Sequence, residues 1–172
     1  MKSIHSFFLA IIIFTAIISC STNKNNTNMK SQAMSEQDAI KLVKPFYDFL
    51  GGDATPAEVQ PSYHNDWVSY YDNSSGRSME ETLGFVSGPL AQMIPDLKWS
   101  IKKVYVTSEN TIVVRGEAVG TPVGDNFMGT PIAGGKSFKF MSIDIHELKD
   151  DKIIKTYHVE DWINAIQQVA GE

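Results

Sequence analysis

Residues that could exchange protons with a small molecule gather near the C-terminus of the sequence. Asp144 and His146 lie on one predicted strand, and His158 lies on the next. A turn at residues 149–151 would join the two strands as a hairpin, which brings these side chains toward one end of a sheet, together with Tyr157 and Asp161. Strand alternation places Asp144 and His146 on one face and prevents all five side chains from facing inward. Carboxylate and imidazole groups in such positions are typical of general acid–base chemistry.

Each of these residues also has a structural interpretation. Asp161 directly precedes a predicted helix, so its side chain could cap that helix whether or not it also acts on a substrate. His146 could be a half-buried strand residue, and His158 could be a structural residue or one at the rim of a pocket. The triplet His64-Asn65-Asp66 suggests metal ligands, but a turn before a strand explains it better.

The elements that would position these residues are helical in the first half of the chain and extended in the second. Helices are predicted at residues 35–50, from residue 56 and at 79–94, with a strand at 67–71. Pro45 is expected to kink or split the first helix. Further strands are predicted at residues 97–107, 111–120, 136–148 and 152–160, followed by a helix at 162–169. This order predicts an α+β domain whose helices pack on one face of an antiparallel sheet.

Composition limits the classes of protein to which the chain could belong. Its 172 residues suffice for one ordinary domain, and 42% of them are hydrophobic. Lys and Arg number 15 and Asp and Glu number 20, so the net charge of −5 argues against nucleic-acid binding. A single cysteine excludes an intramolecular disulfide and a cysteine-cluster zinc site.

The N-terminus has the features of an export signal. Lys2 precedes an apolar run of twelve residues at 7–18, which is short for a membrane span of about 20 residues. The run ends in Ile17-Ile18-Ser19-Cys20, which resembles a bacterial lipobox. This resemblance implies a lipoprotein signal peptide at 1–19, lipidation of Cys20, and anchoring to a membrane of the bacterial cell envelope, outside the cytoplasm. An ordinary secretory cleavage site or a buried structural cysteine is the alternative.

Short motifs spread over the remaining chain form an ordered set. In chain order they are Phe46-Tyr47, Gly52-Asp53, Pro95-Asp96-Leu97, residues 120–124 and 127–131, Gly135-Lys136, residues 143–146, Lys152-Ile153, Tyr157-His158 and Asp161. Together with the element order, this set resembles the SnoaL-like branch of the nuclear transport factor 2-like superfamily. The resemblance implies a cone-shaped α+β fold, with N-terminal helices packed on a curved antiparallel sheet. We therefore expect a SnoaL-like domain at 35–172, preceded by a flexible tether at 20–34.

The resemblance also implies roles for individual residues. In the family's cyclases one aspartate at the end of the last strand is the acid–base catalyst, and it corresponds to Asp161. Desolvation in an apolar pocket would raise the pKa of that carboxyl. His146 would hydrogen-bond the carbonyl oxygens of the substrate, and this mechanism needs neither a metal nor a cofactor. The other substrate-binding residues are expected to be Asp144, His158, Tyr157, Trp67, Phe127 and Met128.

The glycine-rich segment at residues 120–135 lacks the helix entry of a phosphate-binding loop. We expect it to form a mobile flap over the mouth of the cone, with Phe127 and Met128 at its tip.

Three functions are compatible with these residues and this fold. The first is an enzyme of the cyclase, isomerase or hydrolase type, which acts through Asp161 on a small apolar or carbonyl-containing ligand. The second is a protein that binds such a ligand without turnover, and the third is a dimerising module, because related folds pair through the sheet. A homodimer is expected on the same ground. An exported protein lacks the cytosolic synthases beside which polyketide cyclases work, and a pocket with at least two convergent polar groups would favour an enzyme.

Overall fold

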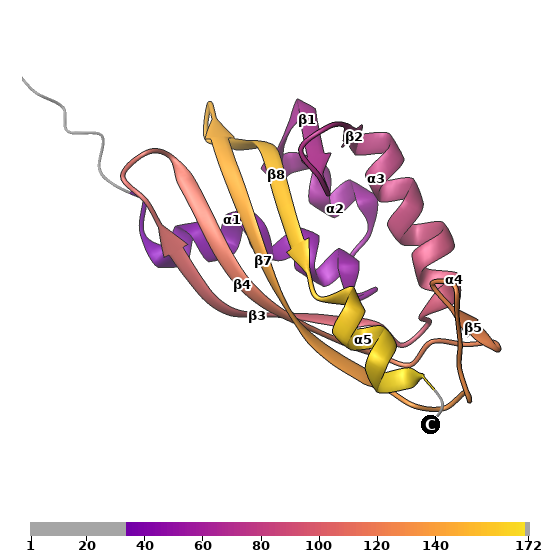
Figure 1. Cartoon of the computed structure of the whole chain (residues 1–172). Helices are drawn as coiled ribbons and strands as arrows, with labels where there is room; N and C mark the ends of the chain where they lie inside the picture. Colours follow the sequence, from indigo (N-terminus) through magenta and orange to yellow (C-terminus); the bar gives the residue numbers. More distant parts are fainter. Residues whose placement is uncertain (1–33, 171–172) are drawn as a thin grey trace, which may run out of the picture. The chain divides into compact units, whose positions relative to one another are not determined.

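Six strands form one sheet in the computed structural model, which describes residues 34–170 (Figure 1). In spatial order they are β2 (Gly76–Ser78), β1 (Tyr63–Tyr70), β8 (Lys152–Glu160), β7 (Phe138–Lys149), β4 (Thr111–Gly120) and β3 (Lys98–Val106). Neighbouring strands are antiparallel except β1 and β8, which run parallel. A separate hairpin of β5 (Asn126–Phe127) and β6 (Thr130–Pro131) turns at Met128 and Gly129, which both have positive φ.

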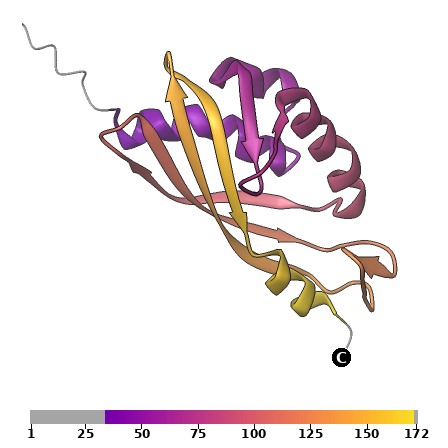
Figure 2. The same cartoon turned by 45° about the horizontal axis from the view of Figure 1, so that its top comes forward.

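The helices before β3 lie against the sheet (Figures 1 and 2). Their apolar side chains share one core with those of the strands. They are α1 (Glu36–Leu50), α2 (Pro56–Val59), the 3-10 turn η1 (Gln60–Ser62), α3 (Met79–Phe85), the π-helical turn η2 (Val86–Leu90) and α4 (Ala91–Met93). Local capping sets where they begin. Ser35 Oγ accepts a hydrogen bond from the Asp38 N–H, and Ser78 and Glu81 cap α3 reciprocally.

The last helix, α5 (Trp162–Val169), follows β8 directly and packs on β7 (Figure 1). The pairing of β8 with β7 ends at Glu160, opposite Ser142. Beyond that point the Gln168 side chain accepts a hydrogen bond from the Lys139 N–H and donates one to the Lys139 carbonyl. The side-chain amide thus satisfies the backbone of β7 where the neighbouring strand has ended.

Side chains alternate strictly along β7. Phe138, Phe140, Ser142, Asp144 and His146 are buried, and the residues between them are exposed or half-buried. The inner face of this strand therefore changes from aromatic near its start to polar near its middle. Trp162 of α5 packs on the aromatic part, with its ring centroid 4.6 Å from that of Phe140. Tyr47 of α1 packs on the polar part.

The structure confirms the predicted α+β fold with helices on a curved sheet, and β4, β8 and α5 have the predicted bounds. The sheet is antiparallel as predicted, except for the parallel pair β1 and β8. Two local expectations are wrong. Of the kink or split expected at Pro45, the split is wrong: α1 continues through Pro45, where the neighbouring residues Val43, Phe46 and Tyr47 are buried in the core and hold the helical turns. His64-Asn65-Asp66 lies inside β1 rather than in a turn, at an irregularity in the pairing of β1 with β8.

The predicted signal peptide at 1–19, Cys20, and the predicted tether up to residue 33 lie outside the residues that the structure describes. Within residues 34–170, no helix combines the length and the hydrophobicity that crossing a membrane requires.

Candidate functional site

Asp144 is the centre of a buried hydrogen-bond network on the inner face of the sheet. Its Oδ2 accepts a hydrogen bond from the Tyr47 hydroxyl at 2.7 Å, and its Oδ1 lies 2.7 Å from Nδ1 of His158. Asp144 and His158 face each other on β7 and β8 and are only 3% and 7% exposed. A carboxylate this deeply buried requires partners in place of water, and α1 and β8 supply them.

The network continues in two directions from Asp144. Nε2 of His158 lies 2.8 Å from Oγ of Ser69 on β1. On the other side, the Tyr47 hydroxyl lies 3.2 Å from Nε2 of His146, and Nδ1 of His146 lies 3.0 Å from Oγ1 of Thr156. Because the Tyr47 proton goes to Asp144, Nε2 of His146 is the donor to Tyr47, and Nδ1 accepts from Thr156. The network therefore assigns His146 as a neutral imidazole with its proton on Nε2.

The surroundings of His146 agree with this assignment. The side chain is fully buried, and burial lowers the pKa of the imidazole to about 4, although the Asp144 carboxylate opposes this effect. His146 is thus uncharged at neutral pH. Its contacts lie within the buried network, where it orients the Tyr47 hydroxyl.

Because His146 is buried and uncharged, the protein should be less stable in mild acid. Below about pH 6.5 the unfolded chain binds a proton at this residue, whereas the folded chain does so only near pH 4, so the free energy of unfolding decreases as the pH falls through this window. At about 1.4 kcal/mol per pH unit, the loss due to His146 approaches roughly 3 kcal/mol. Denaturant unfolding of the wild type and of His146→Gln at pH 7 and pH 4.5 measures it. The difference between the two pH values should be smaller in the variant, and equal differences would contradict a lowered pKa.

A small pocket opens beside this network. Its volume is about 240 Å³, and its walls are formed by Leu50, Tyr71, Arg77, Phe85, Val86, Leu90, Trp99, Met128, Glu160 and Trp162. The Tyr71 ring stacks on the His158 ring with a centroid distance of 4.9 Å, so the pocket wall and the network are in contact. Glu160 and Arg77 are the two charged side chains among these residues, and the others are apolar or aromatic.

Glu160 is the acidic group of the pocket. Its side chain is half-buried, and its Oε2 accepts a hydrogen bond from Nε1 of Trp162 at 2.6 Å. Burial raises the pKa of the Glu160 carboxyl above its ordinary value, while the nearby His158 lowers it, Asp144 raises it further, and the Trp162 hydrogen bond lowers it. A carboxyl with a raised pKa holds its proton closer to neutral pH, where it can act as an acid and, once ionised, as a base.

Trp99 joins the pocket wall to the network from the other side. Its Nε1 donates to Oγ of Ser142 at 3.2 Å, and that hydroxyl makes a longer contact of 3.4 Å with Oδ2 of Asp144. Gly116 lies opposite Ser142 on β4, where a Cβ atom would lie 2.5 Å from the Ser142 hydroxyl and 3.0 Å from Nε1 of Trp99. The absence of a side chain at Gly116 leaves the room that this hydrogen bond needs.

Asp144, His158 and Glu160 are also of types that bind metal ions. Their candidate ligand atoms lie within 4.8 Å of one another. However, both ring nitrogens of His158 are engaged, one by Asp144 and the other by Ser69. A metal ion would have to replace one of these hydrogen bonds, so the arrangement suits proton transfer better than metal binding.

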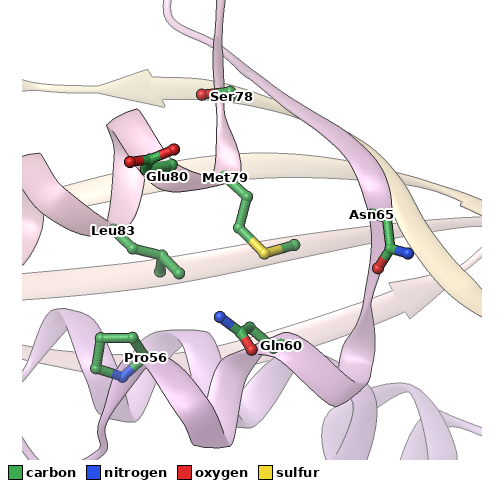
Figure 3. Close-up of a pocket in the computed structure, with 7 residues that line it drawn as sticks. All are labelled: Pro56, Gln60, Asn65, Ser78, Met79, Glu80 and Leu83. Atoms are coloured by element: carbon green, nitrogen blue, oxygen red, sulfur yellow. The ribbon is translucent and has the colours of Figure 1, made fainter.

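A wider hollow lies between α2 and the start of α3, where the side chains of Met79 and Leu83 point toward Gln60 and Pro56 (Figure 3). Its volume is about 580 Å³, and its walls are formed by Pro56, Gln60, Asn65, Ser78, Met79, Glu80 and Leu83. The acidic group in this wall, Glu80, is exposed to solvent. Since the Glu160 pocket holds a half-buried carboxyl with a raised pKa and this wall holds only an exposed one, we regard the Glu160 pocket as the candidate site.

The structure brings some of the predicted site residues together and separates others. Asp144, His146 and His158 belong to the buried network, and Met128 lines the pocket. Trp67 lies in the core, where its Nε1 donates to Oγ1 of Thr156 at 2.9 Å. Tyr157 alternates with His158 and stacks on Tyr70 with a centroid distance of 5.1 Å, on the opposite face of the sheet.

Phe127 lies elsewhere than expected, whereas Asp161 occupies the predicted position between the last strand and the last helix. Phe127 is not at the tip of a flap: it is fully buried and stacks on Phe138 at 5.8 Å, because the β5–β6 hairpin turns this side chain into the core. Asp161 is exposed and caps α5, where its Oδ1 accepts a hydrogen bond from the Asn164 N–H at 3.2 Å. The capping interpretation is confirmed, and catalysis by Asp161 stays a prediction.

Sequence reasoning missed Glu160, Arg77, Tyr71 and Tyr47. A signal for Glu160 was present, because it follows His158 by two residues on one strand and alternation places both on the same face. The other three residues are brought to the site by contacts between distant elements, for which the sequence offers no comparable signal.

Helices packed on a curved sheet give the chain the cone-shaped fold of nuclear transport factor 2-like proteins. Within that class the chain belongs to the family of SnoaL-like polyketide cyclases, whose model matches residues 42–169. No curated protein matches the sequence of the chain.

Several solved structures have the same fold. A candidate SnoaL-like polyketide cyclase from Jannaschia sp. CCS1 is 18% identical with a TM-score of 0.66, over 82% of this chain and 99% of that one. IdmH, a candidate polyketide cyclase from Streptomyces antibioticus, is 20% identical with a TM-score of 0.62, over 74% of this chain and 95% of that one. An LEH-like epoxide hydrolase from M. tuberculosis is 13% identical with a TM-score of 0.56, over 78% of this chain and 90% of that one. At these identities the likeness shows the fold alone.

Proposed function

We propose that this protein binds a small carbonyl-containing molecule in the Glu160 pocket and that the Glu160 carboxyl exchanges protons with it. The observation that carries the proposal is a half-buried carboxyl with a raised pKa in the wall of a mostly apolar pocket. In its neutral form Glu160 can protonate a carbonyl oxygen. In its ionised form it can take a proton from the carbon beside the carbonyl. The electron pair of the broken C–H bond then forms a C=C bond, and the carbonyl oxygen takes up the negative charge.

A further observation supports an enzyme over a protein that only binds its ligand. The pocket holds two charged groups, Glu160 and Arg77, rather than a single orienting group.

The pocket volume limits the size of the ligand. At about 240 Å³ it lies below the range of roughly 300–1,000 Å³ that is usual for drug-sized ligands. A compact substrate therefore fits better than a polycyclic polyketide, and cyclase, isomerase and hydrolase chemistry on small molecules all use steps of this kind.

Deuterium exchange of a simple ketone tests the proposal without knowledge of the natural substrate. The methyl protons of acetophenone exchange with D₂O by way of the enol, and the protein should accelerate this exchange with a rate that saturates as the ketone concentration rises. Proton NMR measures the exchange. A rate no higher than that of heat-denatured protein would contradict proton transfer and would favour the alternative, a pocket that binds ligands without turnover.

Lipidation of Cys20 would anchor this domain to a membrane outside the cytoplasm, through a tether at 20–34. The proposal rests on the apolar run and on Ile17-Ile18-Ser19-Cys20. We expect the wild type expressed in bacteria to partition into the detergent phase of a Triton X-114 extraction, and Cys20→Ala to lose at least part of that partitioning. Identical partitioning of both proteins into the aqueous phase would contradict the anchor.

Homodimerisation through the outer face of the sheet is the remaining part of the proposal. Met141 and Ile145 of β7 and Val159 of β8 share this face and are 54%, 39% and 71% exposed. A second copy would cover these side chains, which favours association. Light scattering on residues 35–172 should give a dimer at micromolar concentration, and Val159→Lys should shift it toward the monomer. A monomeric wild type would contradict this part.

A further inference from the structure

Arg77 is a charged group of the pocket wall that proton transfer by Glu160 does not use. It lies on β2, paired with Ser69 of β1. Its guanidinium carbon lies 5.0 Å from the centroid of the Tyr71 ring and 4.8 Å from that of the Phe85 ring. Both rings line the same pocket. Arg77 is exposed to solvent, and because a cation is attracted to the face of an aromatic ring, these two contacts hold its guanidinium against the pocket wall.

Three acidic side chains lie near Arg77 in sequence, and none forms an ion pair with it. Glu80 is exposed to solvent, and the other two form hydrogen bonds elsewhere. Asp72 Oδ1 accepts hydrogen bonds from the N–H groups of Ser74 and Ser75 in the turn that leads to β2. Glu81 Oε2 accepts from the N–H and the hydroxyl of Ser78 at the start of α3. Within residues 34–170 the Arg77 guanidinium forms no ion pair. Its charge is therefore available to a ligand.

Glu160 lies in the same pocket but does not neutralise Arg77. Its carboxyl is held by Trp162, on the side of the pocket where β8 ends. The pocket thus presents a cation and a carboxyl at separate positions, with apolar and aromatic side chains making up the rest of its walls. A molecule that fills this space meets Arg77 at one position and Glu160 at another.

We propose that Arg77 binds an anionic group of the substrate, which makes the substrate a small carbonyl compound that also carries a carboxylate. This inference rests on the proposed function, since it names the substrate class of the same pocket. A guanidinium binds a carboxylate through two parallel hydrogen bonds, and this geometry fixes orientation as well as charge. With the carboxylate at Arg77, the carbonyl end of the molecule is directed to Glu160.

A matched pair of probes tests the inference. The 3-benzoylpropionate anion carries an aromatic ketone and a carboxylate, and its primary amide has nearly the same shape without the charge. Calorimetric titration of the full chain in detergent should show the anion binding about tenfold or more tightly than the amide. Arg77→Gln should reduce the affinity for the anion to that for the amide and leave the amide unaffected. Arg115→Gln, which removes an exposed arginine from β4 outside the pocket, is the control and should change neither affinity.

The outcomes separate this inference from the function on which it rests. Equal affinity of the wild type for the anion and the amide would overturn the role of Arg77 and leave the Glu160 pocket in place, as would an equal loss in Arg115→Gln. A wild type that binds neither probe would overturn the proposed function together with the inference. If Arg77→Gln binds neither probe, Arg77→Lys decides the matter. Retained preference for the anion supports the inference, and loss of all binding contradicts it.

Discussion

The Glu160→Gln variant is expected to catalyse the deuterium exchange of acetophenone at least about a hundredfold more slowly than the wild type. A glutamine amide has nearly the shape of the carboxyl but neither gives nor takes the proton, and positioned general acid–base catalysis contributes about 10²–10⁴ in rate. The Trp162 N–H can still donate to the amide oxygen, so the pocket should keep its form. Initial rates measured by proton NMR, with the melting temperature of each protein as a check on folding, give the comparison.

Asp161→Asn is the matched control, because it makes the same chemical change one residue further along the chain. Asparagine caps helices about as well as aspartate, and the Asp161 side chain is exposed at the start of α5. Its exchange rate should stay within about twofold of the wild type and its melting temperature within a few degrees. The resemblance to the family's cyclases assigns catalysis to Asp161 instead. A large loss in Asp161→Asn with little change in Glu160→Gln would support that assignment and contradict ours.

Asp144→Ala should lower the free energy of unfolding by roughly 3–5 kcal/mol. The substitution removes the acceptor of the Tyr47 hydroxyl and the partner of Nδ1 of His158, and it leaves both polar groups buried without a replacement. Denaturant unfolding measures the effect. Asp66→Ala is a suitable control, because that side chain is 84% exposed and its loss should change the free energy by less than about 0.5 kcal/mol. A loss below about 1 kcal/mol in Asp144→Ala would contradict a stabilising role for the network.

The parts of the fold that follow from local sequence were predictable. The β-branched run at 111–120 and the run at 152–160 gave the bounds of β4 and β8, because strand alternation and turn residues are encoded over a few positions. Alternation also placed Asp144 and His146 together on the buried face. The predicted split of the first helix at Pro45 failed, since burial of the residues around Pro45 outweighs the loss of one backbone hydrogen bond.

The site itself depended on contacts that local patterns do not encode. Tyr47 contacts Asp144 across 97 positions of the chain, and this contact determines which ring nitrogen of His146 carries the proton. Arg77 reaches the pocket through β2, a strand of only three residues, and its position depends on the aromatic rings that it meets there. Strand alternation alone could have placed Glu160 on the same face as His158. The family resemblance instead implied a catalytic role for the next residue, Asp161, which caps α5.

The central claim, that Glu160 is the proton-exchanging group of the pocket, is tested most directly by the pKa of its side chain. Carbon-detected NMR of protein labelled at the glutamate carboxyl carbons gives one titration curve per residue, and the curve absent from Glu160→Gln belongs to Glu160. We predict a midpoint above the ordinary value of 4.5, because burial near Asp144 disfavours the charged form. A midpoint at or below 4.5 would mean that the carboxyl is ionised like one on the surface, and it would contradict the role given to Glu160.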